Sequence, residues 1–154
     1  AASPQLNPGA MLSIRPATAA ALDALIGTDH VAVHSADRRD AIAEWVALGQ
    51  CHLAARDGAV AGYVALTRSF FRSPFIEMLM VGAAFRRIGI GRALVEHCIG
   101  LTPPEQKLWT STNESNAPMR ALLPQLGFEQ TGLFEHLDEG DPELIFLRWP
   151  VEGH

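Results

Sequence analysis

Cysteine, tyrosine and basic residues are all scarce in this chain of 154 residues. The two cysteines, Cys51 and Cys98, form no C-x-x-C pair. The six histidines form no H-E-x-x-H motif of the kind typical of metal sites; they are His30, His34, His52, His97, His136 and His154. We therefore expect two reduced thiols, no metal centre and a cytoplasmic location.

Long apolar runs are absent as well, since no stretch approaches the roughly 18 residues of a membrane span. We expect a soluble protein with no membrane partner. The net charge of −5 disfavours nucleic acid as the main partner, because that binding depends on Lys and Arg neutralising phosphates. A hydrophobic content of 48% with 19% charged residues argues against disorder.

The length predicts one domain. The first ten residues, AASPQLNPGA, are loop-like and precede Met11, so we interpret residues 1–10 as a remnant of expression and Met11 as the natural start. The predicted single domain spans residues 11–150.

The most informative stretch runs from Ile76 to Leu101. An apolar strand ends at Val81, and a turn with the sequence RRIGIG follows at residues 86–91. A helix comes next, with apolar residues and one histidine at helical spacing: Ile90, Ala93, Leu94, His97, Cys98 and Leu101. The N–H groups at a helix start lack intrahelical partners and the macrodipole is positive there, so glycines that let an anion approach create a phosphate site. Three of the twelve basic residues, Arg86, Arg87 and Arg92, gather at this turn and favour a small polyanionic ligand.

The remaining elements follow from periodicity and capping residues. Before the central stretch we predict a strand over 11–16, a helix from Thr18 to Gly27, a helix from Ser35 or Asp37 to Gly49, and a hairpin over 52–67 with a type I′ turn at Asp57-Gly58. Residues 68–74 are predicted to form a loop, in which Phe70 and Phe71 are either core or an exposed apolar lip over a binding site. After it we predict a strand over 107–112, a helix capped by Asn116 that stops at Gly127, and strands over 128–137 and 144–149.

The resulting order, β-α-α-β-β-β-α-β-α-β-β, predicts an α/β (α+β) fold with a mixed sheet flanked by helices. This order of elements, together with three motifs, resembles the GNAT superfamily of acyl-CoA-dependent N-acyltransferases. The resemblance covers residues 11–149. The three motifs are Arg86-x-x-Gly89-x-Gly91, the Asn113-to-Met119 run before a helix, and Leu126-Gly127-Phe128. The runs at residues 110–128 and 137–144 also look like a bacterial subgroup of that superfamily whose substrates are often unknown. The resemblance implies a mostly antiparallel sheet of about seven strands with about four helices.

The resemblance also implies acetyl-CoA as co-substrate. In the family the pyrophosphate lies on the glycine turn, which here comprises Arg86, Arg87, Ile88, Gly89, Ile90, Gly91 and Arg92. The pantetheine arm follows the strand before it, at Leu79, Met80 and Val81. Asn113 or Asn116 is expected to hold the pantetheine or cover the cofactor. The alternatives are an ordinary helix start for the glycines and a plain N-cap for Asn116.

Glu77 interrupts the apolar strand and is the candidate general base for acyl transfer to an amine. The alternative is a carboxylate on a solvated sheet face or at a partner contact. Many family members protonate the leaving sulfur with a tyrosine at the position of Leu123, so this chain lacks the usual acid. Tyr63, the only tyrosine, is expected to pack in the core. The acidic loop over 138–143 could attract a cationic amine, but a solvated turn is favoured, and His136 beside it is expected at the surface.

These residues predict an N-acetyltransferase that moves an acetyl group from acetyl-CoA to a primary amine of a small molecule or peptide. A non-catalytic acyl-CoA sensor or regulatory module of the same fold is the alternative, motivated by Leu123. A nucleotide-binding protein that holds ATP on the glycine turn is weaker, because no G-K-[S/T] follows. The acceptor amine and a homodimer are left open.

Overall fold

The computed structural model describes residues 11–151. The predicted expression remnant at residues 1–10, and His154, lie outside the described residues. The described chain forms two compact units. The first contains residues 11–66 and 78–97, and the second contains residues 67–77 and 98–151.

The helices and strands follow the predicted order, with two added 3-10 turns, η2 and η3. Their bounds are β1 (Leu12–Pro16), η2 (Ala19–Ala21), α1 (Leu22–Thr28), α2 (Ala36–Ala47), β2 (Cys51–Arg56), β3 (Ala59–Phe70), β4 (Ser73–Val81), η3 (Ala83–Phe85), α3 (Ile90–Leu101), β5 (Leu108–Asn113), α4 (Ala117–Gln125), β6 (Phe128–Phe134) and β7 (Glu143–Arg148). The strands are hydrogen-bonded in the order β1-β2-β3-β4-β5-β7-β6, and β4 with β5 is a parallel pair within this mostly antiparallel sheet. The predicted mixed sheet with four α-helices is confirmed for the described residues.

In the first unit, β1 pairs antiparallel with β2, and β2 with β3. The β2–β3 turn has the predicted geometry, because Asp57 and Gly58 both have positive φ, at 50° and 84°. Helix α2 begins where Ser35 accepts a hydrogen bond from the N–H of Arg38, as predicted, and Gly49 follows it with φ of 71°. Helix α1 continues through Gly27 to Thr28, so the prediction that Gly27 ends it was wrong.

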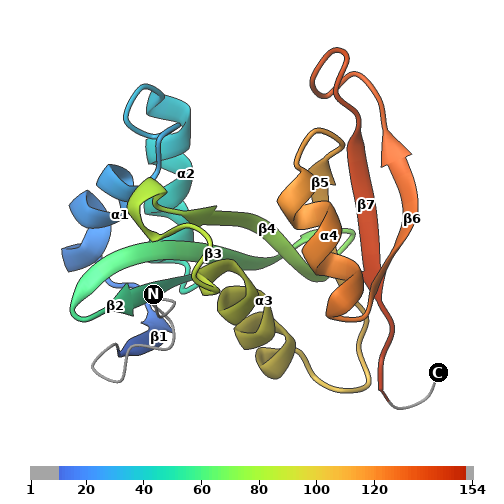
Figure 1. The fold of residues 1–154 in the computed structure, drawn as a ribbon, viewed down its shortest axis with the longest axis horizontal. Helices are drawn as coiled ribbons and strands as arrows, with labels where there is room; N and C mark the ends of the chain where they lie inside the picture. The colour runs from blue at the N-terminus through green and yellow to red at the C-terminus, as the bar shows by residue number, and fades with distance from the viewer. Residues whose placement is uncertain (1–10, 152–154) are drawn as a thin grey trace. The chain divides into compact units, whose positions relative to one another are not determined.

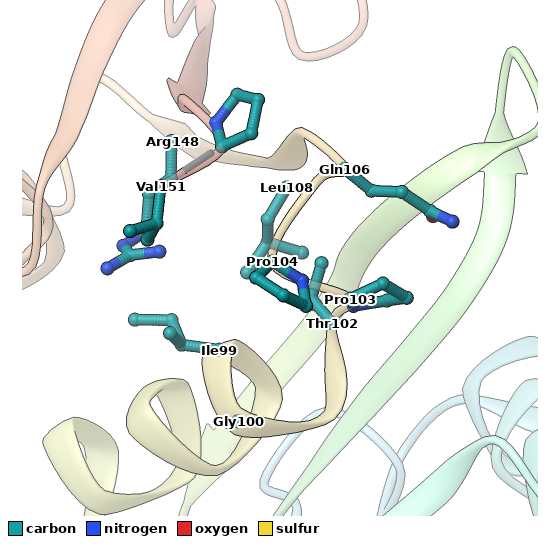
Figure 2. A pocket seen from close by; sticks show the side chains of 10 residues that line it. Ile99, Gly100, Thr102, Pro103, Pro104, Gln106, Leu108, Arg148 and Val151 are labelled. Atoms are coloured by element: carbon teal, nitrogen blue, oxygen red, sulfur yellow. The ribbon is translucent and has the colours of Figure 1, made fainter. Parts of the chain in front are cut away.

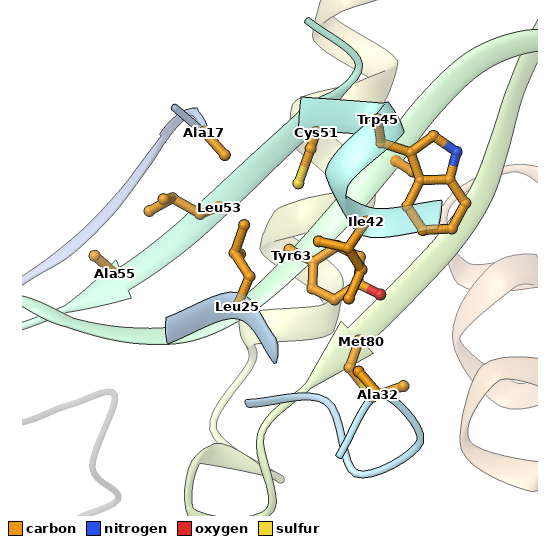
Figure 3. Close-up of a cluster of buried hydrophobic side chains, with 11 residues drawn as sticks. Ala17, Leu25, Ala32, Ile42, Trp45, Cys51, Leu53, Ala55, Tyr63 and Met80 are labelled. Carbon is orange, nitrogen blue, oxygen red and sulfur yellow. The ribbon is translucent and has the colours of Figure 1, made fainter. Parts of the chain in front are cut away.

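The core of the first unit lies between the strands and the pair α1 and α2, which run side by side in Figure 1. Figure 3 shows this cluster, with contributions from every layer: Leu25 from α1, Ile42 and Trp45 from α2, Cys51 and Leu53 from β2, Tyr63 from β3 and Met80 from β4. Burial of this apolar surface is the main force that holds the helices on the strands.

In the second unit, β5 pairs in parallel with β4 at Phe75 and Ile76 and antiparallel with β7, and β7 pairs with β6. Helix α4 contacts β6 (Figure 1) and buries Leu123 completely. Asn116 caps α4 by accepting a hydrogen bond from the N–H of Met119, and Gly127 follows the helix with φ of 89°.

The largest difference from the sequence-based interpretation is at residues 68–74, where the predicted loop was wrong. Strand β3 extends to Phe70 and β4 begins at Ser73, so a two-residue turn of Phe71 and Arg72 joins them. Both turn residues have positive φ, at 52° and 62°, although neither is of a type that favours this conformation. The hairpin signal was therefore missing from the sequence, because Phe-Arg is not a usual type I′ pair.

Candidate functional site

The glycine turn lies in the first unit, between β4 and α3. Arg87 and Gly89 both have positive φ, at 65° and 89°. The carbonyl of Gly89 accepts the first hydrogen bond of α3, from the N–H of Ala93, at 3.0 Å. The N–H groups of Ile90 and Gly91 therefore belong to the helical turn that has no intrahelical acceptor, which is the geometry of an anion site at a helix start.

The two glycines of this turn differ in how an added side chain would fit. A Cβ at Gly89 would meet no atom within 4 Å, but the φ of 89° strains any other residue. A Cβ at Gly91 would lie 3.6 Å from Cδ2 of Leu79 and 3.9 Å from Cγ2 of Val81, which are ordinary contacts. The start of α3 thus sits against β4 in the first unit, and it brings the predicted pyrophosphate turn beside the predicted pantetheine strand. That both glycines are needed to admit phosphates stays a prediction.

The exposure of the turn suits a charged ligand. Arg86, Arg87 and Gly89 are exposed, whereas Ile88 and Arg92 are half-buried and Ile90 is buried. Ile90 therefore anchors the helix start while two guanidinium groups remain in water, available to a polyanion. Met80 is buried in the core of the unit, with Leu79 and Val81 half-buried.

Close backbone packing supports the strand beside the turn. A Cβ at Gly62 on β3 would lie 2.5 Å from the carbonyl oxygen of Met80 and 3.2 Å from Cα of Val81. The N–H of Gly82 donates to the carbonyl of Ala61 at 2.8 Å. The absence of a side chain at Gly62 therefore sets the path of β4 at two of the predicted cofactor residues.

Glu77 lies in the second unit, on β4, and is half-buried. Its Oε1 accepts hydrogen bonds from Oγ of Ser69 at 2.6 Å and from Oγ1 of Thr67 at 3.0 Å. The carboxylate is thus hydrogen-bonded to two hydroxyl groups of the preceding strand. Sequence reasoning missed both contacts, because it placed residues 68–74 in a loop and so did not bring the end of β3 beside β4.

Asn113 and Asn116 also lie in the second unit, and both have hydrogen-bonding roles there. The Nδ2 of Asn113 donates to Oδ2 of Asp138 at 3.0 Å and to the carbonyl of Asp141 at 3.2 Å. Asn116 is the N-cap of α4, which confirms that interpretation. A contact of either residue with the cofactor stays a prediction.

Carboxylates of the acidic loop, Glu143 included, form hydrogen bonds with serines in and just after β5. Asp141 accepts from the N–H and the hydroxyl of Ser115, and Glu143 accepts from Oγ of Ser111 at 2.7 Å. His136 is exposed and its Nδ1 lies 3.1 Å from Oε2 of Glu139, which places it at the surface as predicted.

Tyr63 packs in the core of the first unit, as predicted, and its hydroxyl donates to Oδ2 of Asp29 at 2.7 Å. Burial and the neighbouring Asp29 raise the pKa of Tyr63, which makes it unsuited to proton transfer near neutral pH. Leu123, at the position of the usual acid, is a completely buried residue of α4. Neither position therefore offers an acid for the leaving group.

Both cysteines are free and buried, and burial raises the pKa of each thiol to about 12. Among the residues that the structure describes, no three His, Cys, Asp or Glu side chains gather into a group that could hold a metal ion. No helix in residues 11–151 is both long enough and apolar enough to cross a bilayer.

A separate pocket of about 250 Å³ lies in the second unit at the end of α3 (Figure 2). It is mostly apolar, and its lining includes Ile99, Pro103, Pro104, Leu108, Arg148 and Val151. None of the predicted site residues lines it.

Comparisons with known proteins agree with this arrangement. Residues 19–128 match the acetyltransferase (GNAT) family. The crystal structure of a GNAT-family acetyltransferase from Bacillus cereus ATCC 10987 is 30% identical, covers 92% of this chain and 99% of its own, and superposes with a TM-score of 0.83.

Two curated relatives match a shorter stretch. The peptidyl-lysine N-acetyltransferase YjaB of Escherichia coli K12 is 34% identical over 67 residues, which is 44% of each chain. Its counterpart in Salmonella typhimurium LT2 is 36% identical over 76 residues, covering 49% of this chain and 50% of the relative. The chain therefore spans about half the length of these two relatives.

Proposed function

Because this chain belongs to the acetyltransferase (GNAT) family, we propose that it transfers an acetyl group from acetyl-CoA to a primary amine of a peptide or small molecule. The observation that carries the proposal is the turn before α3, where Arg87 and Gly89 adopt positive φ beside exposed arginines. The names of the two YjaB relatives, which are peptidyl-lysine N-acetyltransferases, support a peptide amine as the acceptor.

The cofactor-binding residues that we propose are those of the turn and the strand before it. The main chain at Ile90 and Gly91 would donate to the pyrophosphate, with Arg86 and Arg87 adding positive charge. The main chain of Leu79, Met80 and Val81 would hold the pantetheine arm, and Asn113 or Asn116 would cover it. Acetyl-CoA supplies an acetyl group activated as a thioester, which a neutral amine can attack.

Glu77 is the proposed general base. A protonated amine is not nucleophilic, so a carboxylate that accepts its proton, directly or through water, makes the attack possible. A backbone N–H near Val81 would donate to the developing oxyanion. Since Leu123 provides no acid, coenzyme A would leave as a thiolate, which is tolerable for an alkyl thiol with a pKa of about 8.5. We also propose a cytoplasmic location, supported by the two free, buried thiols.

Calorimetric titration of acetyl-CoA and thiol release with a panel of amines and lysine peptides test the function together. We expect binding and turnover in the wild-type protein, and a loss of turnover of at least about 100-fold with retained binding in Glu77→Gln. Replacing Arg86 and Arg87 by Gln should weaken acetyl-CoA binding about tenfold. The exposed Arg72→Gln, which removes charge from the β3–β4 turn, is the control that should leave binding unchanged.

A non-catalytic acyl-CoA sensor is the second candidate, and the buried Leu123 at the acid position favours it. The same measurements separate the two functions. Tight binding without turnover across the whole panel would support the sensor. If acetyl-CoA does not bind at all, both functions are wrong.

A further inference from the structure

The carboxylate of Glu77 receives an asymmetric set of hydrogen bonds within the second unit. Ser69 donates from Oγ to Oε1 at 2.6 Å, and Thr67 donates from Oγ1 to the same oxygen at 3.0 Å. Among the residues that the structure describes, no hydrogen bond or ion pair is formed by Oε2. One oxygen is therefore held by two donors, and the other remains available.

The two hydroxyls support each other. The N–H of Ser69 donates to Oγ1 of Thr67 at 3.2 Å, and the two hydroxyl oxygens lie 2.9 Å apart. Thr67 thus accepts from this backbone N–H, and its hydroxyl lies within hydrogen-bond distance of both Ser69 and Glu77. Thr67 is only 4% exposed, whereas Ser69 is exposed. Thr67 is thus part of the packed strand, and Ser69 forms the shorter contact at the surface.

The β3–β4 hairpin fixes this geometry. The ring of Phe70 stacks on Phe75 with centroids 5.1 Å apart and an interplanar angle of 27°, and it lies 5.4 Å from Trp109 on β5. These contacts hold the end of β3 against β4 on either side of the turn. Ser69, next to Phe70, is therefore kept within reach of Glu77 by side-chain packing rather than by its hydrogen bond alone.

We propose that Ser69, supported by Thr67, is a positioning residue that holds Oε1 of Glu77 so that Oε2 faces the acceptor amine. This inference rests on the proposed function, in which Glu77 is the base. In the proton transfer, Oε2 takes H⁺ from R–NH₃⁺ to give R–NH₂ and the neutral carboxylic acid. Hydroxyl donors stabilise the charged carboxylate, and they also prevent it from rotating away from the amine.

Ser69→Ala tests this role with little change to the fold, because the side chain is exposed. We expect kcat to fall about tenfold with the KM for acetyl-CoA unchanged, since positioning affects the chemical step and not cofactor binding. Ser69→Thr keeps the hydroxyl and should restore kcat. Ser73→Ala, on the other strand of the same hairpin, is the matched control and should behave as wild type.

The double variant Ser69→Ala/Glu77→Gln identifies the route of the effect. If Ser69 acts through Glu77, the second substitution should cost nothing further once Glu77 is replaced. An unchanged kcat in Ser69→Ala, with Glu77→Gln inactive, would overturn the positioning role and leave the proposed function intact. An additional tenfold loss from Ser69→Ala in the Glu77→Gln background would also overturn it.

The inference remains testable if no acceptor in the panel is acetylated. The orientation of the Glu77 carboxylate can be compared in crystal structures of the wild-type protein, Ser69→Ala and Ser73→Ala. Ser69→Ala should leave this carboxylate displaced or in more than one rotamer, with Ser73→Ala unchanged. One identical orientation in the wild-type protein and Ser69→Ala would show that the hydroxyl does not hold the carboxylate.

Discussion

Nε2 of His97 on α3 lies 3.2 Å from Nδ1 of His52 on β2, and the two rings are 4.9 Å apart. This contact joins the helix of the glycine turn to the sheet of the first unit. Burial lowers the pKa of both histidines, and the charge of His97 adds to the effect on His52.

The histidine pair should make stability depend on pH. Because both pKa values are lower in the folded protein, the unfolded chain binds more protons as the pH falls below about 6.5. Stability is therefore fully present above that pH and is lost as the pH falls toward the folded values. Urea unfolding at pH 8 and pH 5 should show a smaller difference for His97→Gln than for wild type. An equal reduction in the control His34→Gln, an exposed residue, would contradict this origin.

Asp29 should be among the most sensitive positions of the first unit. It is completely buried and accepts from the hydroxyl of Tyr63, the guanidinium of Arg38 and the N–H groups of Val31 and Ala32. Asp29→Asn should cost about 3 kcal/mol of unfolding free energy at pH 7, because the substitution leaves the charge of Arg38 without its partner. Asp40→Asn on the exposed side of α2 should change it by less than about 0.5 kcal/mol.

The carboxylate of Asp29 should also make the stability of the protein depend on pH in acid. Burial opposes ionisation, but hydrogen bonds from Tyr63 and Arg38 outweigh it and lower the pKa of Asp29. Its stabilising effect is present above about pH 4 and is lost as the pH falls through the lower folded value. The stability of wild type and Asp29→Asn should therefore converge in acid. A constant difference down to pH 2 would exclude ionisation as the cause.

Gly62→Ala should destabilise the protein, by about 2–3 kcal/mol, because the added Cβ would lie 2.5 Å from the carbonyl oxygen of Met80. The shift of β4 at Met80 and Val81 should also weaken acetyl-CoA binding. Gly27→Ala is the opposite case, since its Cβ meets nothing within 4 Å in α1. That substitution should stabilise by about 0.5–1 kcal/mol in urea unfolding. Equal effects at the two glycines would contradict the close approach.

The β3–β4 turn should gain stability from residues that favour positive φ. Replacing Phe71 and Arg72 by Asn and Gly should add about 1 kcal/mol in urea unfolding, because Asn-Gly is a preferred type I′ pair. Phe71 is 84% exposed, so the substitution removes little buried surface. The reverse exchange, Phe-Arg in place of Asp57 and Gly58, should destabilise. A loss of stability in the first variant would show that Phe71 contributes through its contact with Phe70.

The central part of the chain was predictable because its signals are local. The apolar face of α3, the glycines before it and the Asn116 cap depend on residue types a few positions apart. The hydrogen bonds within one helix turn or one tight turn are determined by such neighbours, and the structure has them where the sequence predicted them. Family resemblance added the mostly antiparallel sheet of about seven strands, and only the structure gave the order of the strands within it.

The sequence by itself determined the order of the elements, the strand, turn and helix from Ile76 to Leu101, and the burial of Tyr63. Only the tertiary structure decided that Ser69 lies beside Glu77, that His52 meets His97, and that Asp29 joins Tyr63 to Arg38. These pairs come from different elements, or from strands joined by a turn with no recognisable sequence signal. Their distances depend on register and packing, which composition and periodicity do not encode.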